Sequence, residues 1–349
     1  MTQRRISTPL RIGKVTVGGE APIAVQSMTK TDTRDILATI NQIKELEECG
    51  CEIVRIAVPD KEAAESISTI KKSVSLPLIA DIHFDYRLAL AALEAGVDGV
   101  RLNPGNIRDR EQIAKVVAAA KERKVPIRIG VNAGSLPPDF EPDISLSERM
   151  VDMALRQIKF VESLDFNLIK LSLKAFDVPA TIRAYQMIAD RIPYPLHLGI
   201  TEAGLPQAGA IRSAIGMGIL LYQGIGDTIR VSLTAHPCEE VNVAYEILKS
   251  LGLRQRGPTL ISCPSCARAE VDIIALAEAA NKELEKITKP IKVAVMGCVV
   301  NGPGEAKDAD VGIACGKGKG AIFRKGKVVK TVDEEILLES LAAEIEAIT

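Results

Sequence analysis

Short runs of β-branched residues alternate with amphipathic helical stretches from residue 23 to about residue 253. The runs predict eight strands, at residues 23–29, 53–59, 78–84, 99–105, 127–132, 167–175, 196–204 and 228–234. Several of the intervening helical stretches end at a glycine, as helices commonly do. Eight strand–helix units over about 230 residues favour a (β/α)8 TIM barrel. A doubly wound open sheet is the alternative, but no Gly-x-Gly-x-x-Gly sequence follows the first strand.

The pattern changes after Gly252. Residues 254–258 have the composition of a short linker, with arginine, glycine and proline. The remaining sequence indicates a strand, a helix, a second strand, a glycine-rich region and a final helix. We therefore expect a barrel domain at residues 1–253 and a small α+β domain at residues 259–349.

Positively charged residues occupy the polar parity of the predicted barrel strands. In the second strand, Val54 and Ile56 share one parity and Arg55 takes the other. Because the branched side chains must pack against the helices, the polar face points into the barrel. Six cations follow this rule: Arg55, Arg101, Arg128, Lys170, Lys174 and Arg230.

Few acids share the inward parity. Asp81 lies with His83 on the third strand, and Glu202 follows the seventh. An unpaired charge in a dry interior costs several kcal/mol. The excess of cations therefore predicts an anionic ligand, with more than one phosphate, at the C-terminal mouth of the barrel. Weaker candidates for hydrogen bonds to this ligand are Asn103, Asn132, Gln26 and Ser232.

The alternative is that the cations are structural and pair with Asp81, Glu52 or Asp98. This explanation suits a single cation such as Lys170 better than it suits all six, because acids of matching parity are too few.

Composition adds little to this picture. The 349 residues are 47% apolar and 26% charged, which is ordinary for a globular protein. The net charge of −1 favours neither nucleic acid nor membranes as a partner, so a basic site must arise locally. The N-terminus does not resemble a signal peptide, and seven scattered cysteines argue for a reducing cytoplasm.

The cysteines of the second domain form the other candidate site. Cys263 and Cys266 lie in "SCPSC", while Cys298 and Cys315 lie beside glycine-rich loops. A thiol redox pair would leave Cys298 unexplained, and structural zinc usually has two closely spaced ligand pairs. The spacing favours an iron–sulfur cluster, with Cys315, Glu305 or no residue as the fourth ligand.

The three cysteines outside these motifs have a different context. Cys49, Cys51 and Cys238 lie at predicted helix ends or in loops, and we expect them to serve in packing.

Several motifs carry a resemblance to one family: "APIAVQSMT", "CEIVRIAVP", "IADIHF", "VRLNPGNI", "IRIGVN", "HLGITEAG", "GMGILLYQGIGDTIRVSLT", "CPSCAR" and "VAVMGCVVNGPGEA". They resemble the 4-hydroxy-3-methylbut-2-enyl diphosphate synthases of the non-mevalonate (MEP) pathway of isoprene biosynthesis. The resemblance covers essentially the whole chain, and it fits the two-domain bacterial form.

The resemblance implies an oxidoreductase with a TIM barrel and a small domain that is similar to nitrite and sulfite reductases. One 4Fe–4S cluster per chain would be held by Cys263, Cys266, Cys298 and Glu305. The implied reaction is the two-electron ring opening and dehydration of 2-C-methyl-D-erythritol 2,4-cyclodiphosphate to 4-hydroxy-3-methylbut-2-enyl diphosphate, with reduced flavodoxin or ferredoxin as donor. The family also implies a cytoplasmic head-to-tail homodimer, in which residues 254–258 would act as the hinge.

The same resemblance assigns expected roles to the barrel residues. Arg55, Arg101, Arg128 and Lys174 would hold the diphosphate, and Asn103, Asn132 and Ser232 would add hydrogen bonds. Glu202 would be the catalytic carboxylate, as proton donor or orienting group. Asp81 and His83 would either orient the cations or form a structural pair.

Two other functions are compatible with parts of the sequence. One is a phosphate- or pterin-binding TIM-barrel transferase with a structural zinc tail. The other uses the basic tract "CGKGKGAIFRKGKVVK" to bind nucleic acid, but its single aromatic residue, Phe323, offers little stacking. We expect this tract to form a solvated hairpin or a docking face for an acidic electron donor.

Overall fold

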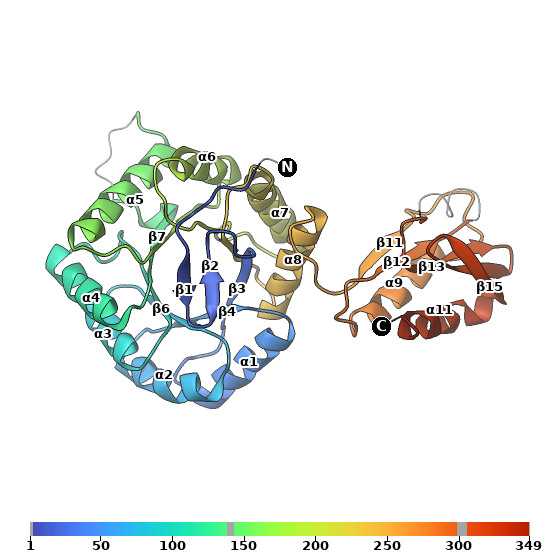
Figure 1. Ribbon diagram of the computed structural model, residues 1–349, viewed down its shortest axis with the longest axis horizontal. Coiled ribbons are helices and arrows are strands. Elements are labelled where there is room, and N and C mark those ends of the chain that lie inside the picture. Colours follow the sequence, from blue (N-terminus) through green and yellow to red (C-terminus); the bar gives the residue numbers. More distant parts are fainter. Residues whose placement is uncertain (1–2, 138–142, 299–305, 349) are drawn as a thin grey trace. The chain divides into compact units, whose positions relative to one another are not determined.

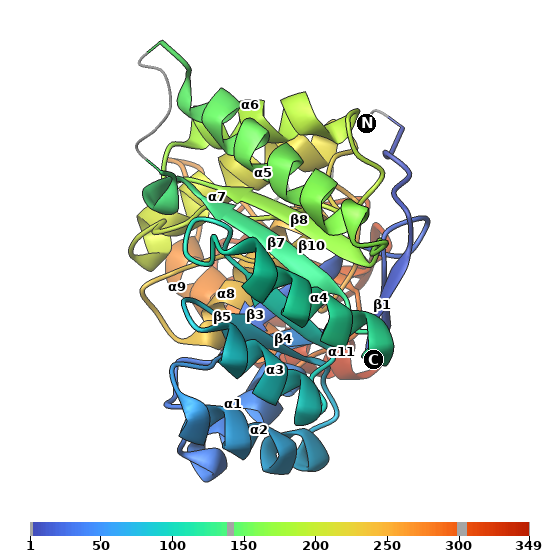
Figure 2. The same ribbon diagram turned by 90° about the vertical axis from the view of Figure 1, so that its left-hand side faces the viewer.

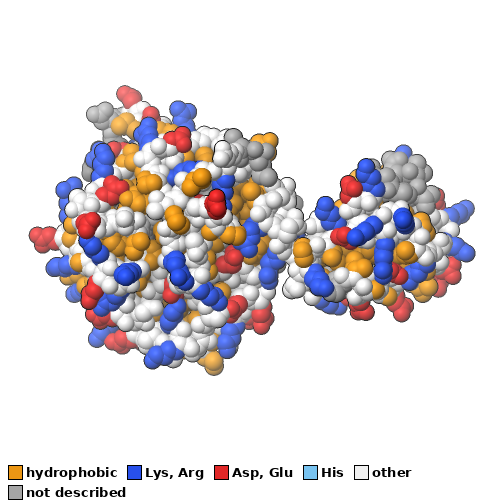
Figure 3. Space-filling view, in the orientation of Figure 1, with side chains coloured by type: hydrophobic (Ala, Val, Ile, Leu, Met, Phe, Trp, Pro, Cys, Tyr) orange, Lys and Arg blue, Asp and Glu red, His pale blue; other side chains and the backbone are white. Residues whose placement is uncertain are grey.

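The computed structural model describes residues 3–137, 143–298 and 306–348. Its chain divides into two compact units, Met1–Arg254 and Gln255–Thr349. Charged side chains of both signs are interspersed over the visible face of each unit (Figure 3). None of the helices that the structure describes is long and apolar enough to cross a membrane.

The first unit contains the eight predicted strands as a nearly closed parallel barrel, consistent with a TIM barrel. The sheet order is β8-β7-β6-β5-β4-β3-β10-β9, and a bridge between Leu171 and Leu196 joins its two ends. The strands are β3 (Ala24–Met28), β4 (Ile53–Ala57), β5 (Leu78–Ile82), β6 (Gly99–Leu102), β7 (Ile127–Asn132), β8 (Ile169–Lys174), β9 (His197–Leu198) and β10 (Thr228–Ile229).

Eight helices surround the strands (Figures 1 and 2). They are α1 (Ile36–Glu48), α2 (Lys61–Ser73), α3 (Tyr86–Glu94), α4 (Arg110–Arg123), α5 (Leu146–Ser163), α6 (Val178–Ala189), α7 (Pro206–Tyr222) and α8 (Pro237–Ser250). Aspartates cap five of them by accepting a hydrogen bond from a backbone N–H of the first turn: Asp35, Asp60, Asp85, Asp109 and Asp177. Each such cap stabilises a helix by about 1 kcal/mol.

The core confirms the parity argument. Val54, Ile56 and Ile82 are fully buried between the sheet and the helices. Arg55 and Asp81, which have the opposite parity, line a cavity inside the barrel. The alternation of side chains along each strand thus separates an apolar outer face from a polar inner face.

A short N-terminal hairpin, which the sequence pattern did not predict, packs against the barrel strands. Strands β1 (Leu10–Ile12) and β2 (Val15–Val17) pair antiparallel, and Figure 1 shows them across one end of the barrel. Their apolar side chains form a small core with Ala24, Ile53 and Ile79, near the beginnings of β3, β4 and β5. The hairpin therefore covers the N-terminal end of the barrel and leaves the C-terminal mouth for a site.

A disulfide joins Cys49, which follows α1, to Cys238 in the first turn of α8. The two cysteines are 189 positions apart, and their Cα atoms are separated by 5.8 Å. The expectation of simple packing roles was wrong for this pair, because closure of the barrel brings its first and last helices together. Cys51 is buried as expected, and burial raises the pKa of its thiol to about 12.

Within its described residues, the second unit is a five-stranded sheet with two α-helices. The order is β11 (Thr259–Ser262), β12 (Lys292–Met296), β13 (Val311–Gly316), β14 (Lys319–Arg324) and β15 (Lys327–Asp333). The first three strands are parallel and the last two pairings are antiparallel. Helices α9 (Ile273–Leu284) and α11 (Leu337–Glu346) share an apolar core with this sheet.

Three of these strands, β13, β14 and β15, lie in the glycine-rich region, for which the sequence pattern predicted no strands. The glycines make room for neighbouring side chains: a Cβ on Gly312 would lie 2.5 Å from Phe323, and one on Gly320 would overlap Leu337. The basic tract forms the β14–β15 hairpin, where Arg324 and Lys330 both pair with Glu344.

Candidate active site

A cavity of about 110 Å³ lies among side chains at the C-terminal ends of the barrel strands. Its lining residues are Arg55, Asp81, His83, Arg101, Arg128, Asn132, Lys174, Thr201, Arg230 and Ser232. Six of the predicted substrate residues are in this set. Thr201 was not singled out from the sequence, because a threonine after a strand has no distinctive pattern.

Asp81 organises one side of the cavity. Its carboxylate is 3% exposed, and its oxygens lie 3.3 Å from Arg55 Nε and 3.1 Å from Arg101 Nη1. His83 Nε2 is 3.4 Å away. Burial acts to raise the pKa of Asp81, but the charges of Arg55 and Arg101 and the hydrogen bond from His83 outweigh it, so the pKa lies below its usual range.

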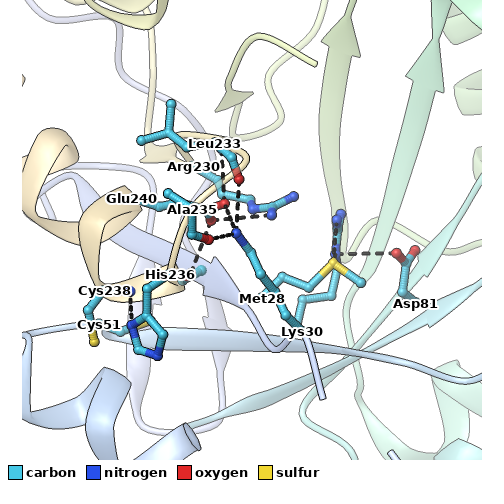
Figure 4. A network of polar contacts seen from close by, with 12 residues as sticks. Met28, Lys30, Cys51, Asp81, Arg230, Leu233, Ala235, His236, Cys238 and Glu240 are labelled. Atoms are coloured by element: carbon cyan, nitrogen blue, oxygen red, sulfur yellow. Dashed lines mark hydrogen bonds and ion pairs between the residues drawn. The ribbon is translucent and has the colours of Figure 1, made fainter. Parts of the chain in front are cut away.

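Glu240, on α8, is a second buried carboxylate, and it contacts the lining residue Arg230. It is 1% exposed, and it lies 3.3 Å from Arg230 Nη2 and 3.2 Å from Lys30 Nζ (Figure 4). Strand parity could not find this acid because a helix contributes it. A signal was nevertheless present: Glu240 occupies the apolar stripe of α8, in register with Val241 and Ala244.

Among the described residues, three inward cations have no carboxylate in contact. Arg128 Nε and Lys170 Nζ are buried without a hydrogen bond to any described residue. Lys174 Nζ lies 3.2 Å from His197 Nε2, and His197 Nδ1 lies 2.8 Å from Thr228 Oγ1. Burial, followed by neighbouring cations, lowers the pKa values of Arg128, Lys174 and His197 well below their usual values.

Two of the acids that the structural alternative invoked have other partners. Glu52 binds Arg254, with oxygens 3.0 and 3.2 Å from its guanidinium nitrogens. Asp98 pairs with Lys71. Asp81 alone among the three acids holds inward cations, and Glu240 is the acid that the prediction missed.

The interior is therefore short of negative charge. Among the described residues, the carboxylates of Asp81 and Glu240 contact only three of the six inward cations, Arg55, Arg101 and Arg230. Burial lowers even the pKa of Arg55, to about 10, despite the opposing effect of Asp81. A bound anion would relieve this electrostatic cost, and a diphosphate carries enough charge and acceptor oxygens to contact several cations together.

Asn103 and Glu202 do not line the cavity. Asn103 Oδ1 accepts a hydrogen bond from Gly105 N at 3.0 Å, and its Nδ2 donates to Ser135 Oγ at 3.0 Å. Glu202 is exposed in a turn after β9, with a left-handed φ of 55°. The structure therefore places Asn103 in a loop network and Glu202 beside Thr201 at the rim.

The cysteines of the second unit lie near the ends of β11 and β12. The backbone N–H of Gly297, next to Cys298, donates to Cys263 Sγ at 3.3 Å. Cys266 is an exposed thiol after a turn in which Ser265 has φ 66°. Glu305 lies outside the described residues, and within the described ranges no group of three or more His, Cys, Asp and Glu is placed to hold a metal ion.

Cys315 is separate from this loop arrangement. It lies on β13 and is fully buried. Burial raises the pKa of its thiol to about 11. These features are those of a packed strand residue.

Comparison with known proteins adds family membership. Residues 7–245 match the GcpE TIM-barrel domain, and residues 259–347 match the GcpE protein C-terminal domain. The chain is 65% identical to the 4-hydroxy-3-methylbut-2-en-1-yl diphosphate synthase (flavodoxin) of Dehalococcoides mccartyi, over 99% of both chains. It is 56% identical to the Geobacter sulfurreducens protein of the same name, over 97% of both chains.

Solved structures support the barrel fold alone. The dihydropteroate synthase of Yersinia pestis superposes with a TM-score of 0.50 at 12% identity, covering 70% of this chain and 98% of that one. The spore coat polysaccharide biosynthesis protein spsE of Bacillus subtilis gives a TM-score of 0.52 at 11% identity, covering 70% and 72%. The family matches and the full-length relatives decide the identity: the chain belongs to the GcpE family of 4-hydroxy-3-methylbut-2-en-1-yl diphosphate synthases (flavodoxin), which are oxidoreductases.

Proposed function

We propose that this chain converts 2-C-methyl-D-erythritol 2,4-cyclodiphosphate to (E)-4-hydroxy-3-methylbut-2-enyl diphosphate. Two electrons enter, one ring carbon–oxygen bond opens with its oxygen left on the diphosphate, and one hydroxyl takes up a proton and leaves as water. The observation that supports this substrate is the excess of buried cations around the cavity. The names of the full-length relatives support the product.

In this proposal residues 1–253 bind the substrate. Arg55, Arg101, Arg128 and Lys174 hold the diphosphate, because all four side chains line the cavity. Asn132 and Ser232 also line the cavity and supply hydrogen bonds. Asn103 would contact the substrate only by giving up its hydrogen bonds to Gly105 and Ser135, so its expected role requires that loop to rearrange.

Glu202 is the proposed catalytic carboxylate. It follows Thr201, which lines the cavity, and its exposed position leaves the side chain free to turn toward a bound substrate. A non-glycine residue in the left-handed region is uncommon and is often found at functional sites. In the proposal Glu202 delivers the proton to the leaving hydroxyl or orients that group.

Residues 259–349 form the proposed cluster domain. Cys263, Cys266 and Cys298 fit an iron–sulfur cluster, because they lie at neighbouring strand ends and a backbone N–H already points at the Cys263 sulfur. Glu305 is the proposed fourth ligand. A 4Fe–4S cluster bound there would supply the two electrons singly, from reduced flavodoxin as the relatives' names suggest or from ferredoxin.

A homodimer is also proposed. Helix α7 exposes Ile211, Ile215, Ile219 and Tyr222 at helical spacing, so they form an apolar stripe on one face. An apolar stripe can pack against the same stripe of a second copy across a twofold axis. This supports a second copy of the chain as the partner. The proposal predicts a dimer mass in solution and a shift toward monomer in Ile215→Glu.

Turnover of the cyclodiphosphate by anaerobically prepared protein tests the function. We expect a brown protein that forms the diphosphate product with an artificial reductant, and that loses turnover in Cys298→Ser and in Glu202→Gln. Full activity in Cys298→Ser would overturn the cluster assignment. A colourless zinc protein that does not consume the cyclodiphosphate would overturn the function itself.

A further inference from the structure

We propose that Glu240 is a positioning residue for the substrate site and acts through Arg230. The proposal rests on the proposed function in one respect, namely that the ligand of the cavity is a diphosphate. Strand parity does not mark Glu240, because this residue lies on helix α8. Figure 4 shows its carboxylate beside Arg230, Leu233 and Lys30.

Both oxygens of the Glu240 carboxylate are engaged. Oε2 lies 3.3 Å from Arg230 Nη2 and accepts a hydrogen bond from Ser27 Oγ at 3.4 Å. Oε1 accepts a hydrogen bond from Leu233 N at 3.0 Å and lies 3.2 Å from Lys30 Nζ. A buried carboxylate with this many donors has one favourable orientation, so it can fix the groups around it.

The groups that it fixes belong to the segment after β10. Sheet pairing of that strand ends at Ile229, yet Arg230 and Ser232 lie beyond it and line the cavity. Glu240 holds the segment at Leu233 N, and Lys30 holds it by donating to Leu233 O at 2.9 Å and to Ala235 O. Glu240 also pairs with Lys30. The same carboxylate therefore holds the segment directly and orients the lysine that holds it.

Electrostatics gives the carboxylate a second effect on Arg230. The Arg230 side chain is 13% exposed, and its positive charge repels that of Arg55. Its Nε has no hydrogen-bond partner among the described residues. Without Glu240, repulsion by the other cations would favour a rotamer that turns the guanidinium away from the cavity.

Asp81 and Glu240 therefore divide the carboxylate-paired cations of this region between them. Asp81, on β5, holds Arg55 and Arg101, while Glu240, on α8, holds Arg230 and Lys30. The acids belong to different elements, so each can set the position of its own cations.

Glu240→Gln tests the proposal. The amide oxygen can still accept from Leu233 N, but the amide nitrogen is a donor and cannot pair with Arg230. Binding of inorganic pyrophosphate to the full-length protein is measured by titration calorimetry at low salt. We expect the dissociation constant to rise at least about tenfold, as for the loss of one positioned charge-assisted hydrogen bond. In turnover, KM for the cyclodiphosphate should rise more than kcat falls.

A double-mutant cycle separates positioning from general stabilisation. If Glu240 acts through Arg230, adding Glu240→Gln to Arg230→Met should change pyrophosphate affinity less than twofold. The control is Asp227→Asn. Asp227 is an equally buried carboxylate that binds Ser7 Oγ and Leu196 N away from the cavity, so this change should leave pyrophosphate affinity unaltered. Thermal unfolding of each variant shows whether it is folded.

Equal or tighter pyrophosphate binding by Glu240→Gln would overturn the proposal, because the carboxylate would then act only as a charge that offsets Arg230. An undiminished effect in the Arg230→Met background would overturn it as well, in favour of a purely structural role. If the wild type did not bind pyrophosphate, the proposed diphosphate site itself would be contradicted, and so would the role of Glu240.

Discussion

At the scale of single residues, the barrel mouth depends on a few buried charges whose partners lie on neighbouring elements. Asp81 is the clearest case, since it contacts Arg55 and Arg101 and almost no water. Removing one partner of a buried ion pair leaves an uncompensated charge, which is costlier than the absence of both. The stability of the barrel and the affinity of the site are therefore linked at this residue.

Asp81→Asn should lower the free energy of unfolding by about 3 kcal/mol at neutral pH, measured by urea denaturation. Because the pKa of Asp81 is lower in the folded protein, its contribution is complete above about pH 4 and is lost as the pH falls below that value. The variant and the wild type should thus converge in stability in acid. A difference in stability independent of pH would contradict this explanation.

Lys174 should take up a proton when a diphosphate binds. Burial and then Arg128 lower its pKa well below the usual value in the free protein, whereas nearby phosphate oxygens would raise it. Pyrophosphate titrations at several pH values, in buffers of different ionisation enthalpy, would report this uptake. Lys174→Met should reduce it, and identical uptake by that variant would place the proton on another group.

At the scale of elements, the eight barrel strands could be predicted because alternation of side chains is a strong local signal. The early end of β9 could not, since Gly199 lies close to the backbone after β10 and Glu202 takes a left-handed turn. A Cβ on Gly199 would lie 2.6 Å from Arg230 O. Hairpin β1–β2 has strands of three residues, too short for a detectable period.

The same reasoning explains which residues of the site could be predicted from the sequence and which could not. Parity found Arg55, Arg101, Arg128 and Lys174, because each lies on a strand whose side chains alternate regularly. Glu240 was missed because it enters from a helix. The Cys49–Cys238 pair was missed because 189 positions separate its members, and only the closed barrel brings them together.

The disulfide between α1 and α8 should stabilise the barrel by restricting the unfolded chain. For a loop this long the chain-entropy argument gives about 5 kcal/mol as an upper value, and measured effects are commonly about 2–4 kcal/mol. Adding a reductant should therefore lower the thermal midpoint of the wild type. The double variant Cys49→Ala/Cys238→Ala should not respond to the reductant, and a wild type that is equally indifferent would argue that the two thiols are not joined.

At the scale of the whole molecule, every residue that lines the cavity belongs to the unit that ends at Arg254. Arg254 is fixed to that unit by Glu52, by a hydrogen bond to Ile23 O at 2.7 Å and by the ring of Tyr245. Residues 255–258 are therefore the first that could act as the hinge proposed from the family resemblance.

A chain truncated after Arg254 should fold and bind pyrophosphate within about twofold of the full-length affinity, because its lining residues and their partners are all retained. Calorimetry and thermal unfolding measure the two properties. The truncated chain should form no product from the cyclodiphosphate under any reductant. Loss of pyrophosphate binding on truncation would show that the second unit helps to build the anion site.

The disulfide between α1 and α8 also determines the effect of a break in the backbone. Residues 49 to 238 and the disulfide form one closed covalent ring that includes most of the barrel. A single proteolytic cut anywhere within that ring would open it without releasing a fragment. Such nicked protein should run as one piece on a denaturing gel and separate into two only after reduction. New chain ends could accordingly be introduced in the loops between barrel helices and strands while the polypeptide remained a single covalent molecule.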